Sequence, residues 1–156
     1  MKQIRVLLIE DHFLARMALH SVLSGHPQIQ IIGEAGDGEL GISMYRQLRP
    51  DVVVLDLRLP DLDGWTVASR LRSNPRTQQI PVMITTAEPL TREQIAVLAT
   101  EYDTMLLKPF EMATFLAVIE RLLASQPSNR GTAPSAKTLQ RCVGTGCQTP
   151  PDQPGS

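Results

Sequence analysis

Five short apolar runs, each containing β-branched or long aliphatic residues, recur along the first 125 residues and constrain the fold more than any other feature. They occupy Ile4 to Ile9, Ile29 to Gly33, Val52 to Leu55, Val82 to Thr86 and Met105 to Leu107. Because these runs are apolar without strict alternation, they are typical of strands covered on both faces, as in a parallel sheet between two layers of helices. The sequence therefore predicts five buried parallel strands.

Helical patterns fill the stretches between these runs. Thr91 with Gln94 three residues on has the form of a capping box, which indicates a helix start, and Pro50 is expected to end the second helix. Five strands alternating with five helices predict a doubly wound α/β fold with right-handed crossovers. In the last helix the apolar residues recur every three or four positions and line one face: Met112, Phe115, Leu116, Ile119, Leu122 and Leu123.

The composition changes after Ser125. Residues 126–156 contain five Pro, four Gly, three Ser and four Thr, and no aromatic residue. Such a segment buries too little apolar surface to offset the entropy of ordering, so we expect one folded domain over residues 1–125 and a disordered tail over 126–156. Cys142 and Cys147 lie in this tail and supply two of the four ligands of a structural zinc site. We interpret them as incidental thiols, with a reversible disulfide as the alternative.

Charge and hydropathy restrict the partners. A formal net charge of -1 and a pI near 6.3 give no electrostatic footprint for nucleic acid or for an anionic membrane. No apolar run approaches the roughly 18 residues of a membrane span, and the N-terminus runs into the first predicted strand without a cleavage site. We expect a cytoplasmic protein that binds other proteins, with no nucleic-acid and no membrane partner.

Polar side chains follow four of the predicted strands. The first strand leads into Glu10 and Asp11, the third into Asp56, the fourth ends at Thr86 and the fifth leads into Lys108. The carboxyl ends of parallel strands meet at one edge of a sheet, so these side chains are expected to converge there. Three neighbouring carboxylates repel one another, which predicts a hard divalent cation with oxygen ligands, such as Mg2+, among them.

This set of residue types suits phosphoryl transfer. Asp56 can act as the nucleophile because carboxylates form acyl phosphates, while Lys108 and the Thr86 hydroxyl can meet the charge on the phosphoryl oxygens. Glu10 and Asp11 alone could be acids that favour the dipole of the first helix. Asp56 and Lys108 reduce that interpretation to a minor one.

Five motifs occupy these strand ends and the loops after them. They are Leu8-Ile9-Glu10-Asp11-His12, Val53-Val54-Leu55-Asp56-Leu57-Arg58-Leu59-Pro60, Asp63-Gly64-Trp65, Ile84-Thr85-Thr86-Ala87 and Leu107-Lys108-Pro109-Phe110. Together they make residues 4–124 resemble the response-regulator receiver family of two-component signalling, which includes chemotaxis regulators. The resemblance implies a flavodoxin-like, doubly wound sheet of five parallel strands in the order 2-1-3-4-5, with five helices.

The resemblance also implies roles for the acidic residues. Asp56 would be the phosphoacceptor, and Mg2+ would be bound by Asp11, by Asp56 and by the backbone carbonyl of Arg58, with Glu10 acting through a water molecule. Arg58 lies two residues after the acceptor, and Glu88 lies two residues after the threonine at the end of the fourth strand. We expect these two side chains to pair across the crevice, shield the acyl phosphate from water and slow its hydrolysis.

The remaining implied roles concern the phosphoryl group and the switch. Thr86, Ala87 and Lys108 would contact the phosphoryl group. The family's switch position, three residues before the lysine, is often aromatic; here it is Met105, whose flexible thioether can fill the same gap without the aromatic's shape. The stretch Glu101 to Thr104 replaces the glycine-containing turn that the family leads one to expect.

The predicted function is a single-domain response regulator, phosphorylated by a sensor histidine kinase or a phosphotransfer protein and signalling through a downstream protein. Phosphorylation-driven homodimerisation stays open, and we expect no enzymatic activity beyond its own phosphorylation and slow dephosphorylation. A longer transcription factor, a phosphatase of the haloacid-dehalogenase type and a pseudo-receiver are the alternatives. Arg58 stands where such a phosphatase has its general acid, and the intact acids, Thr86 and Lys108 argue against a pseudo-receiver. Leu90 to Leu98, similar to the start of a helix-turn-helix, is interpreted as a sheet-covering helix.

Overall fold

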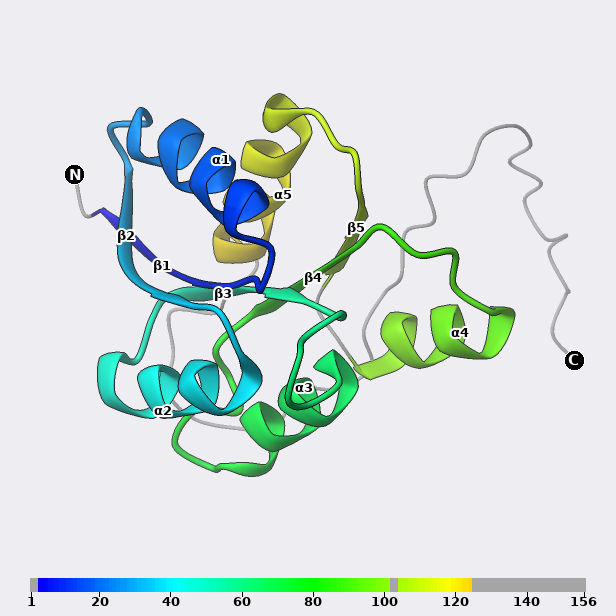
Figure 1. The fold of residues 1–156 in the computed structure, drawn as a ribbon. Coiled ribbons are helices and arrows are strands. Elements are labelled where there is room, and N and C mark those ends of the chain that lie inside the picture. Colours follow the sequence, from blue (N-terminus) through cyan, green and yellow to red (C-terminus); the bar gives the residue numbers. More distant parts are fainter. Residues whose placement is uncertain (1–2, 102–103, 125–156) are drawn as a thin grey trace, which may run out of the picture.

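The strands of the computed structural model, which describes residues 3–101 and 104–124, form one parallel sheet. They are β1 (Ile4–Ile9), β2 (Ile29–Ala35), β3 (Val52–Asp56), β4 (Val82–Thr86) and β5 (Thr104–Leu107). Their order is β2-β1-β3-β4-β5 (Figure 1), which confirms the predicted fold class. The predictions for the turn at residues 102–103 and for residues 126–156, including Cys142 and Cys147, lie outside the described residues.

Five helices connect and cover the strands. They are α1 (Phe13–Ser24), α2 (Gly38–Leu48), α3 (Gly64–Ser73), α4 (Arg92–Glu101) and α5 (Met112–Ala124). α1 and α5 cover one face of the sheet, and α2, α3 and α4 lie on the other side (Figure 1). The sheet is therefore the middle layer of three, as the unalternating apolar strands predicted.

Two apolar cores lie on either side of the sheet. Along β1, Leu7 and Ile9 join the core with α2, α3 and α4, whereas Val6 and Leu8 join the core with α1 and α5. Each of these four side chains is at most 1% exposed. Burial on both faces explains why the strand has no polar position along its inner length.

The predicted helix boundaries that the structure describes are confirmed. The amide of Gln94 donates to Thr91 Oγ1 at 3.2 Å, and the amide of Thr91 donates to Gln94 Oε1 at 2.9 Å, which is a reciprocal capping box before α4. α2 ends at Leu48, and Arg49 follows with a left-handed φ of 45°. Pro50, which cannot extend the helix, comes next.

β2 is longer than the apolar run that predicted it. The run ended at Gly33, but pairing with β1 continues to Ala35, which lies opposite Ile9. Gly33 does not interrupt the strand, because its lack of a side chain makes room for α2: a Cβ there would lie 2.8 Å from Leu48 Cδ1. β5 begins one residue earlier than predicted, at Thr104.

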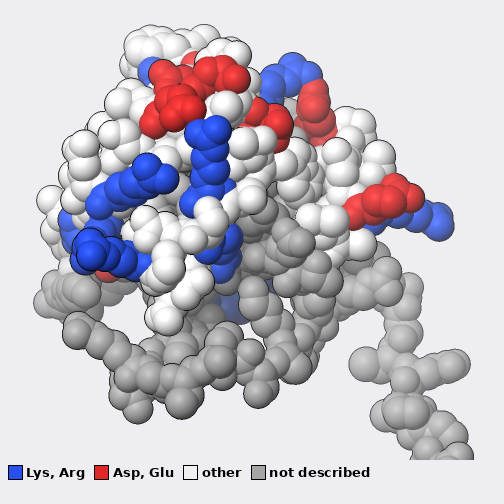
Figure 2. Space-filling view, turned by 90° about the horizontal axis from the view of Figure 1, so that it is seen from below, with Lys and Arg blue, Asp and Glu red and all other residues white. Residues whose placement is uncertain are grey.

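The face that carries α2 and α3 has charges of both signs. Figure 2 shows acidic side chains gathered toward one edge of this view, with lysine and arginine side chains beside them and over the middle. Charges of opposite sign stand next to one another, and one ion pair joins the two helices: Arg70 Nη1 lies 2.9 Å from Glu39 Oε1. Such an exposed pair contributes little to stability.

Candidate metal and phosphoacceptor site

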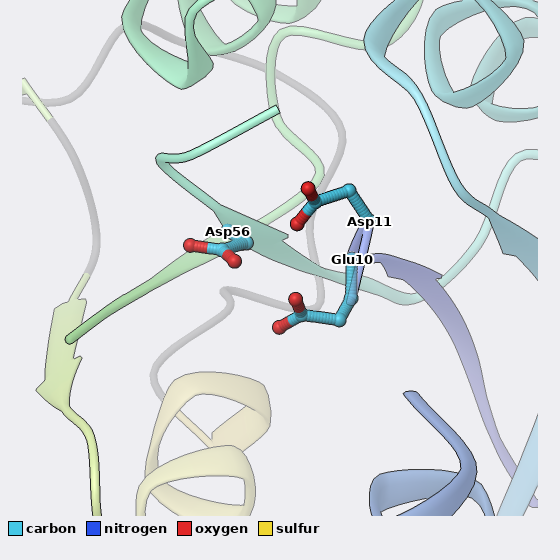
Figure 3. Close-up of side chains that lie close together, drawn as sticks. All are labelled: Glu10, Asp11 and Asp56. Carbon is cyan, nitrogen blue, oxygen red and sulfur yellow. The ribbon is translucent and has the colours of Figure 1, made fainter. Parts of the chain in front are cut away.

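Three carboxylates meet at the carboxyl edge of the sheet. Glu10 and Asp11 follow β1, and Asp56 is the last residue of β3, so neighbouring strands bring the three together (Figure 3). One oxygen from each side chain lies within 4.8 Å of the others. Glu10 and Asp56 are buried, at 2% and 6% exposure, and Asp11 is half-buried. The predicted convergence of the three acids is present.

Lys108 enters the cluster from the loop after β5. Its ammonium forms ion pairs with Glu10 and with Asp56, the latter at 3.3 Å between Nζ and Oδ2. Its amide donates to the Thr86 carbonyl at 2.7 Å, which ties this loop to the end of β4. Backbone pairing therefore places the main chain of Lys108 beside the cluster.

Burial and charge act in opposite directions on the two members of the tighter ion pair. Burial raises the pKa of the Glu10 carboxyl, and the hydrogen bond from Lys108 offsets this only in part, so the net pKa lies above its ordinary value. Burial lowers the pKa of the Lys108 ammonium, but its bond to Glu10 and the charge of Asp56 outweigh burial and raise it. The ammonium stays charged at neutral pH.

The two oxygens of Asp56 have different partners. Oδ1 accepts the amide of Arg58 at 3.1 Å, and Oδ2 faces the Lys108 ammonium. These contacts fix the plane of the carboxylate at the end of β3. A carboxylate held in this way is oriented before any reaction partner arrives.

Thr86 is the last residue of β4, and Ala87 and Glu88 follow it on the neighbouring side of the same edge. Thr86 is buried at 2% exposure, and its hydroxyl oxygen accepts the amide of Glu88 at 3.1 Å. Ala87 is exposed. The carboxylate of Glu88 forms an ion pair with the Arg58 guanidinium, as expected, and the two side chains are 52% and 72% exposed.

Met105 lies deeper, within β5. It is half-buried, is paired with Ile84 of β4 and packs against the core shared with α2, α3 and α4. The predicted switch position therefore lies two residues before the pair of Thr86 and Leu107 in the register of β4 and β5.

The donor set fits Mg2+. The cluster offers carboxylate oxygens, which this hard cation prefers, and two of its three acids are buried. Lys108 supplies a single positive charge against three acids, so a further cation would relieve their repulsion. Lys108 pairs more closely with Glu10 than with Asp56, which suits an indirect contact of Glu10 with an ion better than a direct one.

Two features of the site were missed in the sequence. Arg16 in α1 donates from Nη1 to the Glu10 carbonyl at 2.6 Å and lies 3.6 Å from Glu34, so it holds the backbone beside the cluster. Asp61, in the loop after Asp56, accepts two amides of α2. No sequence motif connects the residues in either contact. The one available signal was Asp61 itself, because an acidic residue in a loop often accepts backbone amides.

The fold and the site together define a flavodoxin-like α/β protein with an acidic cluster and a lysine at the carboxyl edge of its sheet. The family model of the response regulator receiver domain matches residues 6–120. The chain therefore belongs to the response regulator receiver domain family.

Known relatives and structures support this placement. The chain is 35% identical over 121 residues to the DNA-binding dual master transcriptional regulator RpaA of Synechocystis sp., covering 76% of this chain and 48% of that protein. It is 35% identical over 109 residues to protein-glutamate methylesterase/protein-glutamine glutaminase 1 of Methanospirillum hungatei, covering 68% of this chain and 31% of that protein. A putative response regulator from Chloroflexus aurantiacus superimposes with a TM-score of 0.71 at 28% identity, covering 79% and 99% of the respective chains.

The chain thus spans about half or less of the length of these two curated relatives. Within residues 3–101 and 104–124, no helix combines the length and the apolar character that a membrane span requires.

Proposed function

We propose that this chain is a phosphorylation-dependent switch that accepts a phosphoryl group on Asp56. The observation that carries the proposal is the Asp56 carboxylate at the end of the central strand, held by the Arg58 amide and facing the Lys108 ammonium. The donor would be a phosphohistidine of a sensor histidine kinase or a phosphotransfer protein.

The transfer requires few groups from the chain itself. An Asp56 oxygen forms a bond to phosphorus, and the bond from phosphorus to the donor imidazole breaks. The imidazole nitrogen keeps the electron pair and leaves as a neutral ring after taking up a proton. Lys108 would balance the negative charge on the phosphoryl oxygens, and Thr86 and the backbone at Ala87 would contact the group once it is in place.

Mg2+ is the cation that we propose for the acidic cluster. Asp11, Asp56 and the backbone carbonyl of Arg58 would hold it, with Glu10 acting through a water molecule. When bound, Mg2+ would neutralise the charge of the acids and of the incoming phosphoryl group. The support is the donor set, in which carboxylate oxygens from three residues lie within 4.8 Å of one another.

Acetyl phosphate tests the proposal directly. We expect wild type to acquire an acid-stable, base-labile phosphate in the presence of Mg2+, detected by phosphoprotein staining and intact mass. Asp56→Asn should acquire none, and wild type without Mg2+ should acquire far less. Asp51→Asn is the matched control, because Asp51 lies just before the other end of β3, and it should be phosphorylated like wild type. An unmodified wild type under all conditions would contradict the proposal.

The output that we propose is protein binding, with Thr86 and Met105 as the moving parts. Thr86 would turn toward the phosphoryl group and release the Glu88 amide that it now accepts, and Met105 would fill the space behind it. The changed face around α4, β5 and α5 would then bind a downstream protein, with homodimerisation through the same elements as an open alternative. A cytoplasmic location remains a prediction.

DNA binding and phosphatase activity are the two alternative functions. The regulator RpaA is described as DNA-binding. Residues 1–125 of this chain carry a net charge of -3, which disfavours DNA contact within them, so a longer chain that binds DNA would do so through other residues. A DNA titration tests this, and we expect no binding. Turnover of external phosphate esters is not expected, because Arg58, with its guanidinium paired to Glu88, stands where a second acid would be needed.

A further inference from the structure

The loop between β3 and α3 carries the Arg58 carbonyl that the proposed function assigns to Mg2+. The loop is tied down at its start and at its end. The Leu57 amide donates to the Thr85 carbonyl at 3.1 Å, and the Gly64 amide donates back to the Leu57 carbonyl at 2.9 Å. A Cβ at Gly64 would lie 2.4 Å from Leu57 Cα, so the two ends of the loop approach more closely than a side chain would allow.

A third attachment holds the middle of the loop. Asp61 reaches α2 and accepts two successive amides, that of Gly38 on Oδ1 at 2.7 Å and that of Glu39 on Oδ2 at 2.9 Å. The next amide, that of Leu40, is accepted by Asp37 at 2.8 Å. The first three amides of α2 are therefore all satisfied, two of them by a residue 22 or 23 positions away in the sequence.

The loop also packs closely against α2 and α3. A Cβ at Gly38 would lie 2.7 Å from Val67 Cγ2, 3.1 Å from Leu62 Cβ and 3.2 Å from Asp61 Oδ1. The glycine thus gives the carboxylate and the following leucine the room to sit against the helix start. Leu62 packs against the core beneath α2 and α3, which adds an apolar contact to the polar one.

The span between this attachment and the metal-binding carbonyl is short and stiff. Three peptide bonds lead from Arg58 through Leu59 and Pro60 to Asp61. Pro60 has a fixed φ, and the residue before a proline is restricted to extended conformations. Anchoring Asp61 therefore limits where the Arg58 carbonyl can point.

We infer that Asp61 is a positioning residue for the metal site: by fastening the loop to the start of α2, its carboxylate fixes the Arg58 carbonyl for Mg2+. This inference rests on the proposed function, because it assumes that the acidic cluster binds the ion through that carbonyl. An exposed carboxylate outside the acidic cluster would thus contribute to the affinity of the cluster for the metal.

Metal binding to the full chain tests the inference without phosphorylation. We would titrate Mn2+ into the protein and measure the concentration of free Mn2+ by electron paramagnetic resonance. Displacement of the bound Mn2+ by Mg2+ then gives the affinity for Mg2+. Asp61→Ala is expected to lower the affinity for both ions about tenfold, which is the lower end of the effect of residues that orient metal ligands. Asp61→Asn, which keeps one acceptor oxygen, should fall between wild type and Asp61→Ala.

Asp37→Ala is the matched control. It removes the acceptor of the Leu40 amide at the same helix start and leaves the two hydrogen bonds of Asp61 in place, so it should lower the urea midpoint but leave the metal affinity at the wild-type value. If Asp61→Ala binds both ions as tightly as wild type, or if Asp37→Ala weakens them equally, the positioning role is overturned while the metal site stands. A wild-type chain that binds neither ion overturns both the inference and the proposed metal site.

Discussion

At the residue scale, the ion pair between Arg58 and Glu88 is too exposed to matter for stability, so its predicted role is to shield the phosphorylated Asp56 from water. Its side chains are 72% and 52% exposed, and exposed pairs contribute at most about 1 kcal/mol. An effect of the pair should therefore appear in the chemistry of the acyl phosphate, whose hydrolysis requires water to reach the phosphorus.

Removing the guanidinium should speed the loss of phosphate. We predict that Arg58→Ala leaves the free energy of unfolding in urea within about 0.5 kcal/mol of wild type and raises the dephosphorylation rate several-fold. The measurement is the decay of phosphoprotein after acetyl phosphate has been removed. Glu88→Ala should raise the dephosphorylation rate to a similar extent. The double variant should lose phosphate little faster than either single variant, because all three substitutions break the same ion pair. An unchanged rate in Arg58→Ala would refute the shielding role.

The sequence predicts the positions of site residues better than their partners. Asp56 and Lys108 could be placed at one edge because both follow buried strands, and parallel strands align their carboxyl ends. The ion pair of Lys108 with Glu10 joins residues 98 positions apart, and side-chain direction decides it. The contacts of Asp61 with α2 likewise depend on how closely a loop packs on a helix, which no periodicity reports.

At the element scale, the start of α2 should respond to acid through Asp61. The two amides that it accepts lower the pKa of this carboxyl from 3.8 to about 2. A folded-state pKa below the unfolded value gives a stabilising contribution that is present above about pH 4 and is lost as the pH falls toward 2.

We therefore predict that the difference in urea midpoint between wild type and Asp61→Asn depends on pH. Wild type should be the more stable near neutral pH, and the difference should shrink as the pH is lowered below about 4, because Asn does not titrate. Unfolding followed by circular dichroism at a series of pH values measures it. A difference that stays constant down to the lowest pH at which both proteins fold would show that the carboxylate charge does not stabilise α2.

Element boundaries were predictable where apolar patterns or caps define them and less so where pairing does. The capping box of Thr91 and Gln94 located the start of α4, because its two hydrogen bonds are local. The last residues of β2 were missed, because Ala35 is held by pairing with Ile9 of another strand. Local signals are visible in the sequence, whereas pairing partners become visible only when the sheet is assembled.

At the scale of the whole molecule, one sheet separates two cores, and its strands contribute side chains to both. Val52 and Val54 face the core with α1 and α5, while Val53 and Leu55 face the other. Unfolding of a strand therefore removes side chains from both cores at once. The two halves should consequently unfold together, as small single domains usually do.

The single tryptophan provides the test, because Trp65 in α3 packs against one core and Phe115 in α5 lies in the other. Phe115 is fully buried and stacks on Phe110 at 5.6 Å between ring centroids. Phe115→Ala should therefore cost about 3 to 5 kcal/mol. We expect the urea midpoint from Trp65 fluorescence to fall together with that from circular dichroism, although the substitution lies across the sheet. Leu14→Ala is the control, because this side chain is 66% exposed, and it should shift neither midpoint. If Phe115→Ala leaves the midpoint from Trp65 fluorescence unchanged, the two cores unfold independently.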